Sequence, residues 1–151
     1  MLHIFIDADG CPVKQEVYRV AGRYSLSITL VSNAHMRTPQ EDGIKLVVVE
    51  GHPDAADDWI VEHVGENDIV IAGDIPLAAR CIEKGARVLA PTGRLFTPDS
   101  IGDALATRNL LSQLRDMGTV TGGPPPFDKR DRSRFLQRLD ETIQAALRSG
   151  K

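Results

Sequence analysis

The sequence has few cysteines and no long apolar segment, and both features narrow the classes of protein to which the chain can belong. Its only cysteines, Cys11 and Cys81, form neither a CxxC pair nor a disulfide framework, so no structural zinc site is expected. In a reducing compartment both thiols are expected to be free. The apolar runs stay far below the ~18 residues that a membrane span needs, and Asp7 interrupts the first run without a preceding basic segment. We therefore expect a cytoplasmic protein with no signal peptide and no membrane contact.

A strong excess of charge of either sign is also absent. The net charge of -3 argues against a basic surface that would bind nucleic acid through its overall field. Charge is nevertheless uneven, because acids dominate residues 41–68 and bases dominate residues 128–151. An acidic centre beside a basic tail suits a metal site next to a polyanion, although solvated helix faces give the same pattern.

Alternating apolar strands and amphipathic helices predict a single α/β domain over residues 1–151, with a mostly parallel sheet of about five strands. The link between the second and third strands is near the minimum length for a parallel crossover. The last helix carries the basic tail. The expected strands are residues 2–6, 28–31, 44–49, 68–72 and 87–90, and the expected helices are residues 13–24, 54–64, 76–84, 99–117 and 131–148.

Acidic residues follow two of the expected strands directly. Asp7 and Asp9 come after the first strand, and Asp74 comes after the fourth. Ligands bind at the carboxyl ends of the strands in an open parallel sheet, so these acids converge if the two strands are neighbours. Such a cluster stays ionised when a hard cation neutralises it, and oxygen-only ligation suits Mg²⁺ or Mn²⁺. The alternative is that Asp7 and Asp74 only cap the helices that follow.

Four stretches of the sequence, Ile6–Lys14, Asp57–Ile60, Gly73–Ala78 and Thr121–Pro124, closely resemble the YaiI/YqxD family along nearly the whole chain. That family is grouped with PIN-like domains, whose characterised relatives are largely metal-dependent ribonucleases. The resemblance implies a three-layer sandwich with strand order 3-2-1-4-5. It also implies a nuclease that hydrolyses RNA phosphodiester bonds with a bound Mg or Mn ion.

The resemblance assigns roles to individual acids. It makes Asp7, Asp57 and Asp74 metal ligands and catalytic residues, with Asp9 in support. PIN domains commonly add a fourth acid just beyond the last of these, where this chain has Ile75 and Pro76. Asp9 or Asp58 is the candidate to take the place of that acid.

Basic residues and one glycine-rich stretch are candidates for holding the RNA backbone. The expected phosphate contacts come from Lys14, Arg37, Lys129, Arg130 and Arg132. Thr121 opens a Thr-Gly-Gly run whose backbone amides could bind a phosphate. The alternative is that this run, which continues into three prolines, is a rigid linker.

Three other interpretations of the same residues compete with the nuclease. The run from Ile4 to Gly10 is similar to the first motif of haloacid-dehalogenase-type phosphatases, in which Asp7 would be the nucleophile, and Val31-Ser32-Asn33 resembles their second motif. Cys11, near the start of a helix, is either an activated thiol or, more simply, a buried one. A noncatalytic PIN-like domain that binds nucleic acid or protein is the third interpretation.

Overall fold

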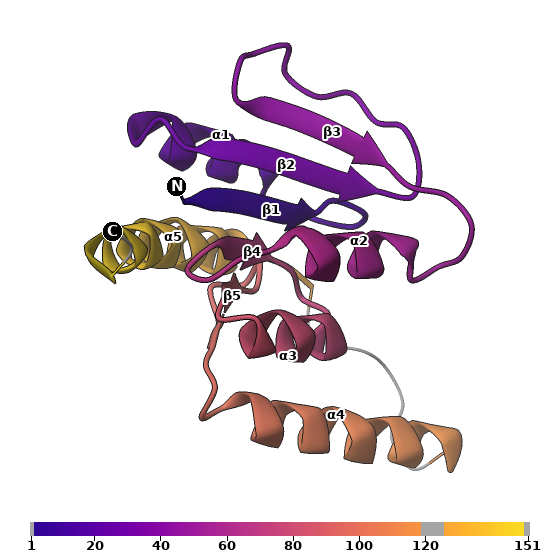
Figure 1. The fold of residues 1–151 in the computed structure, drawn as a ribbon. Helices are drawn as coiled ribbons and strands as arrows, with labels where there is room; N and C mark the ends of the chain where they lie inside the picture. The colour runs from indigo at the N-terminus through magenta and orange to yellow at the C-terminus, as the bar shows by residue number, and fades with distance from the viewer. Residues whose placement is uncertain (1, 119–125, 150–151) are drawn as a thin grey trace.

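The computed structural model describes residues 2–118 and 126–149 as an α/β fold of six strands and five helices (Figure 1). The Thr121 segment lies outside the described residues. In chain order the elements are β1 (His3–Asp7), α1 (Lys14–Arg23), β2 (Ser27–Ser32), β3 (Ile44–Val48), α2 (Ala55–His63), β4 (Ile69–Ile71), α3 (Ile75–Glu83), β5 (Arg87–Leu89), β6 (Leu95–Phe96), α4 (Ile101–Asp116) and α5 (Lys129–Ser149).

The sheet has the order β3-β2-β1-β4-β5-β6. The strands from β3 to β5 are parallel, which confirms the predicted order 3-2-1-4-5. Ile6 of β1 is level with Leu30 of β2 on one side and with Ile71 of β4 on the other. The chain therefore reverses its direction of winding at β1 and β4, and both strands end at the same edge of the sheet.

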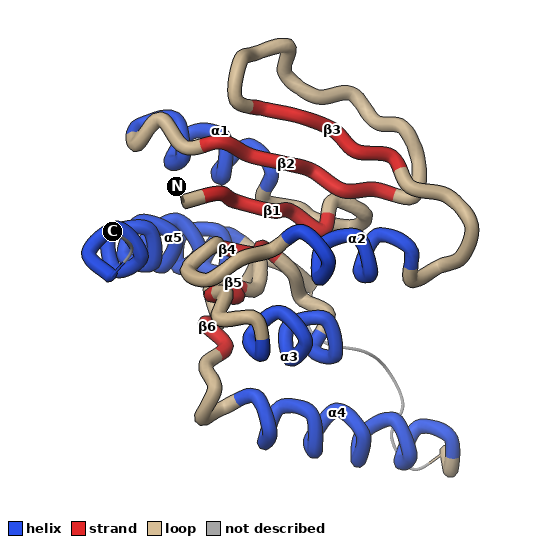
Figure 2. Tube along the Cα trace, viewed as in Figure 1, coloured by secondary structure: helices blue, strands red, loops and turns tan. Residues whose placement is uncertain are grey.

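Helices cover both faces of the sheet, which gives a three-layer sandwich (Figure 2). The side chains of Ile4 and Ile6 face α1 and α5, while Phe5 faces α2 and α3. Because successive residues of a strand point to opposite faces, a central strand between two helical layers must be apolar throughout. The uninterrupted Ile4-Phe5-Ile6 run meets that requirement.

The number of strands differs from the sequence-based expectation. A short antiparallel strand, β6, adds a sixth member beside β5. The sequence did not reveal it because it has only two residues and follows a tight turn at Gly93, where φ is +93°. As expected, residues 33–43 join the parallel strands β2 and β3 without any helix. Asp54 precedes α2, but its backbone at φ −89°, ψ 6° lies outside the extended region typical of a capping residue, and its side chain makes no cap hydrogen bond.

Across the described residues, every helix is too short or too polar to span a membrane. The longest helix, α5, has one buried stripe formed by Phe135, Leu139, Ile143 and Ala146. This stripe belongs to the same core cluster as α1 and the inner residues of β1. The basic C-terminal segment is therefore an integral layer of the fold and not an appended tail.

Replacing Phe135 by alanine is expected to destabilise the fold by about 3–4 kcal/mol, because the fully buried ring leaves a cavity between α5 and the sheet. Urea denaturation followed by circular dichroism measures the loss. Gln137→Ala, at an exposed position of the same helix, should change stability by less than about 0.5 kcal/mol. Equal losses in the two variants would show that α5 is not packed as described.

Candidate metal and phosphodiester site

The carboxyl ends of β1 and β4 bring acids from distant parts of the sequence to one edge of the sheet. Asp7 is the last residue of β1. The register places the residue before it, Ile6, level with Ile71, three residues before Asp74. Asp57 comes to the same edge from the first turn of α2. Parallel neighbours lie about 4.8 Å apart, so the pairing of β1 with β4 alone holds two of these acids near each other.

The charge environment of Asp7 shows that the acids interact. The pKa of Asp7 is raised to about 7, first by burial and then by the negative charges of Asp57, Asp74 and Asp9. Burial removes hydration from this carboxylate, and three like charges repel it, so both effects disfavour its ionised form. Asp7 is therefore the centre of the cluster.

Asp57 is perturbed in the same way. Its pKa is raised to about 6, first by burial and then by the negative charges of Asp74, Asp54 and Asp58, while the Arg80 guanidinium opposes the rise. Since Asp74 repels both Asp7 and Asp57, the three carboxylates share one electrostatic environment. The expectation that residues from β1, α2 and the end of β4 converge is consistent with this coupling.

Asp74 caps a helix and also repels its acidic neighbours. Its Oδ1 accepts a hydrogen bond from the Leu77 backbone N–H at 3.0 Å, so it caps α3. The capping interpretation fails for Asp7, because α1 begins at Lys14, after Val13, and no side chain caps it. Capping fixes one oxygen of Asp74, and the cap orients the carboxylate beside its acidic neighbours.

Asp9 is held by the end of β2. Its two oxygens accept hydrogen bonds from the Ser32 hydroxyl at 2.7 Å and from the Asn33 backbone N–H at 2.8 Å. These donors stabilise the charged carboxylate next to Asp7. Asp9 thus occupies a supporting position at the rim of the cluster.

Asp58 points toward different partners. Its oxygens lie 2.9 Å from Arg80 Nη1 and 3.6 Å from His52 Nε2. A carboxylate already paired with a guanidinium is a weak candidate for a metal ligand, so of the two proposed substitutes for a fourth acid, Asp9 is the better placed.

The donor set of the cluster suits a hard cation, although its geometry is open. In the part of the chain that the structure describes, no three His, Cys, Asp or Glu side chains are gathered tightly enough to enclose a metal ion. Asp7, Asp57 and Asp74 offer carboxylate oxygens only. Mg²⁺ prefers oxygen ligands and keeps several waters, so it needs few direct protein contacts.

The basic residues expected to hold RNA are distributed differently from the prediction. Arg132 is committed to the protein itself, because its Nη1 lies 2.8 Å from Glu16 Oε2 and 3.2 Å from the Pro12 carbonyl. Arg130 lies 3.7 Å from Asp128, and Lys129 is exposed. Arg132 therefore has a structural role that joins α5 to α1.

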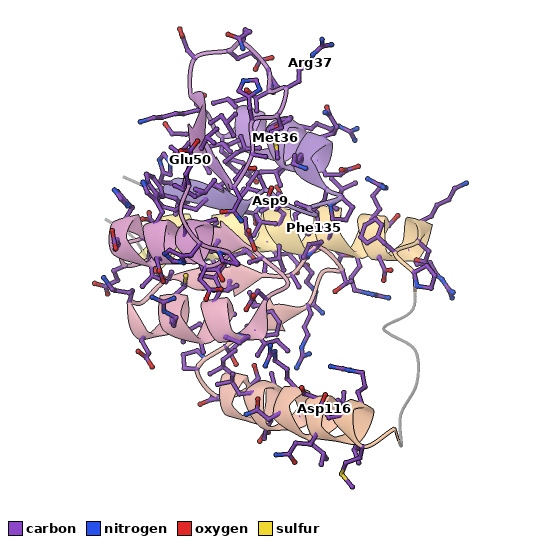
Figure 3. All side chains as sticks on the ribbon, turned by 90° about the vertical axis from the view of Figure 1, so that its right-hand side faces the viewer. Asp9, Met36, Arg37, Glu50, Asp116 and Phe135 are labelled. Carbon is purple, nitrogen blue, oxygen red and sulfur yellow. The ribbon has the colours of Figure 1, made fainter. Side chains whose placement is uncertain are left out.

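Two further basic candidates lie in different parts of the fold. The Lys14 ammonium donates to the Cys11 carbonyl at 3.0 Å, close to the end of β1. Arg37 is exposed at the outer end of the 33–43 connection, far from Asp9 (Figure 3). Lys14 is thus near the cluster, while Arg37 can meet only a ligand that extends well beyond it.

Cys11 is buried, and burial raises the pKa of its thiol. A raised pKa leaves little thiolate at neutral pH, so this residue behaves as a packed thiol and not as a nucleophile.

Comparison with known proteins places the sequence in a family. The family described as "Uncharacterized BCR, YaiI/YqxD family" matches residues 5–145. The chain belongs to the YaiI/YqxD family. A UPF0178 protein of Paramagnetospirillum magneticum is 56% identical over 148 residues, which cover 98% of each chain. A UPF0178 protein of Rhodospirillum centenum is 56% identical over 152 residues, covering 98% of this chain and 99% of the relative. No solved structure matches this YaiI/YqxD chain.

Sequence reasoning missed two charged residues that form ion pairs across the fold. Glu16 and Arg80 pair with charged residues from distant segments, and no motif marks either of them. Ser32 and Asn33 are indicated only by their similarity to a phosphatase motif, and that similarity does not predict that they bind Asp9. Their contacts with Asp9 depend on the register of β2.

The metal-free protein should lose stability as the pH rises. Because the pKa of Asp7 is about 7 in the fold and 3.8 as the unperturbed value, the folded state binds the proton more tightly. The resulting stabilisation is complete below about pH 4 and is lost between about pH 4 and pH 7. Over this pH range the wild type should lose about 2 kcal/mol of its free energy of unfolding, a value that allows for solvent screening. Asp7→Asn should abolish this loss.

Urea denaturation at several pH values in EDTA measures this effect. Asp42→Asn, at an exposed position in the β2–β3 connection, should keep the wild-type pH profile. If the profile of Asp7→Asn matches that of the wild type as well, the proposed crowding of charge around Asp7 is wrong.

Proposed function

We propose that this protein is a divalent-cation-dependent nuclease that hydrolyses RNA phosphodiester bonds at the cluster of Asp7, Asp57 and Asp74. The observation that carries the proposal is the electrostatic perturbation of Asp7 and Asp57 by their acidic neighbours, since Asp7 is repelled by Asp57 and Asp74, and Asp57 by Asp74. Strongly perturbed acids in one place are typical of functional sites. Family membership supports the choice of reaction through the resemblance to PIN-like ribonucleases.

A cation explains why the chain tolerates such a cluster. Without one, the carboxylates repel each other and Asp7 retains a proton near neutral pH. Asp7, Asp57 and Asp74 would hold Mg²⁺ or Mn²⁺, directly or through water. When bound, the ion would activate a water and neutralise charge on a phosphate oxygen.

The chain's own residues then have separate tasks. Asp74 is fixed by the α3 backbone at Leu77, and Asp9 by Ser32 and Asn33. Both carboxylates are therefore oriented before any ligand arrives, which lowers the entropic cost of binding. Asp7 lies between them and would give up its proton as the cation binds.

The direct test is cleavage of a 5′-labelled single-stranded RNA with Mg²⁺, with Mn²⁺ and with EDTA. Wild-type protein should cleave in either metal and not in EDTA. Asp7→Asn and Asp74→Asn should each lower the rate by about 100-fold or more, because a metal contributes several kcal/mol to transition-state stabilisation. Asp42→Asn serves as the matched control and should cleave at the wild-type rate.

Calorimetric titration with Mn²⁺ separates a binding module from an enzyme. Saturable binding that is lost in Asp7→Asn plus Asp74→Asn supports the metal site even when no cleavage is seen. Metal binding that is unaffected by both substitutions contradicts the site, and the acids would then only support the fold, as Asp74 does when it caps α3.

A phosphatase is the second candidate, and the contact between Asp9 and Ser32 favours it. The chain's similarity to haloacid-dehalogenase-type phosphatases involves the Asp7-Ala8-Asp9 motif and the Val31-Ser32-Asn33 stretch, and the structure brings these together at 2.7–2.8 Å. In that reaction Asp7 would attack phosphorus. Beryllium fluoride, which mimics an aspartyl phosphate, should bind to wild-type protein and not to Asp7→Asn if this alternative is correct.

A further inference from the structure

A groove lies between α4 and the rest of the fold, on the side of the sandwich where α3 packs. It has a volume of about 480 Å³ and is lined by apolar and basic side chains. Its lining residues are Ile75, Arg94, Asp103, Ala104, Thr107, Arg108, Leu111 and Arg115. In Figure 3, nitrogen-bearing side chains extend from α4 into the space between this helix and the layers above it.

Of the groove arginines, Arg94 packs its guanidinium over the Phe96 ring, 4.9 Å from the centroid, whereas Arg108 and Arg115 make no such contact among the described residues. Arg94, Arg108 and Arg115 are exposed, and none of them forms an ion pair within the described residues. The arginines of α5 differ, because Arg132 and Arg134 pair with acids of the protein itself. Guanidinium groups that the fold leaves without a counter-ion are available to a ligand.

The charge of the groove selects an anionic ligand. Three arginines face one acid, Asp103, in its lining. The hollow beside β3 has the opposite character, because Glu41 and Asp42 contribute to its lining and no arginine or lysine does. A polyanion is therefore attracted to the α4 groove and repelled from the hollow at β3.

The groove begins next to the acidic cluster. Ile75, which contributes to the groove, is the residue immediately after Asp74. Consecutive Cα atoms are about 3.8 Å apart, so this end of the groove includes the direct backbone neighbour of Asp74. From Ala104 to Arg115 the lining extends roughly 16 Å along α4 at about 1.5 Å per residue.

The floor of the groove distinguishes single strands from duplexes. Ile75 and Leu111 present an apolar surface, with the arginines around it and the buried Ala104 beneath. Exposed bases of a single strand can lie on such a surface while its phosphates meet guanidinium groups. A duplex hides the faces of its bases and would use the arginines alone.

We infer that the α4 groove binds the sugar-phosphate backbone of single-stranded RNA and guides it to the acidic cluster, with Arg94, Arg108 and Arg115 as the phosphate contacts. This inference rests on the proposed function for the statement that the RNA leads to the acidic cluster and is hydrolysed there. The binding itself does not depend on hydrolysis.

Fluorescence anisotropy with a labelled single-stranded RNA in EDTA tests the inference, because no cleavage occurs without metal. Arg108→Ala plus Arg115→Ala should weaken binding by about tenfold at low salt. Loss of two phosphate contacts should also reduce the slope of log affinity against log salt by about 1.4. Arg108→Lys plus Arg115→Lys should retain most of the affinity because the charges remain.

The matched control is Arg19→Ala plus Arg23→Ala, which removes the same charge from exposed positions of α1 on the opposite face of the sheet. This variant should bind RNA within about twofold of the wild type. If it weakens binding as much as the groove variant does, only net charge is involved and the inference is overturned. The inference would also be overturned if polyglutamate displaced the labelled RNA as well as unlabelled RNA does, because the groove would then accept any polyanion.

Cleavage assays on the same variants separate this inference from the proposed function. Cleavage by the wild type together with undiminished RNA binding by the groove variant contradicts the groove and leaves the nuclease intact. Conversely, weakened binding by the groove variant in a protein that never cleaves supports the groove and contradicts the nuclease.

Discussion

The repulsion among carboxylates at the carboxyl edge of the sheet is the constraint on which the rest of the site depends. Asp7 ends the central strand, where burial removes part of its hydration and three acids surround it. A fold accepts such a cluster only when other interactions offset the cost. The apolar residues of β1 and β4, which are almost fully buried, supply that stability a few residues away from the acids.

The topology makes the clustering unavoidable. Parallel pairing of β1 with β4 aligns their carboxyl ends, and the reversal of winding there leaves no helix crossing over the edge. The first turns of α2 and α3 lie beside this edge, so α2 contributes Asp57 and α3 begins with Asp74 as its cap. The sandwich therefore positions the acids through its backbone, and side chains such as Ser32 only adjust them.

Much of this could be predicted from residue patterns. The buried run at Ile4–Ile6 and the helical spacing of Val13, Val17 and Val20 indicate their elements directly, because each burial pattern has its own period. The order of the first five strands came from the family resemblance, since periodicity does not say which strands pair. The convergence of Asp7 with Asp74 depended on that order.

Other features could not be predicted because they depend on distances between remote segments. Arg132 and Glu16 are more than a hundred residues apart in the sequence, so their pairing could not be predicted. The arginines of the C-terminal segment were therefore expected to be available to RNA, whereas Arg132 joins α5 to α1. The short β6 strand carries too few residues to show alternation. Likewise, the α4 groove combines residues from three segments whose charges appear unremarkable along the chain.

Site-resolved titration of the aspartate carboxyl carbons by NMR, in metal-free protein, addresses the convergence of the acids most directly. The account predicts that Asp7 titrates near pH 7, and that neutralising Asp57 and Asp74 as asparagines moves this midpoint downward by about one unit or more. An Asp7 carboxyl that titrates near pH 4 and does not respond to those substitutions would contradict it.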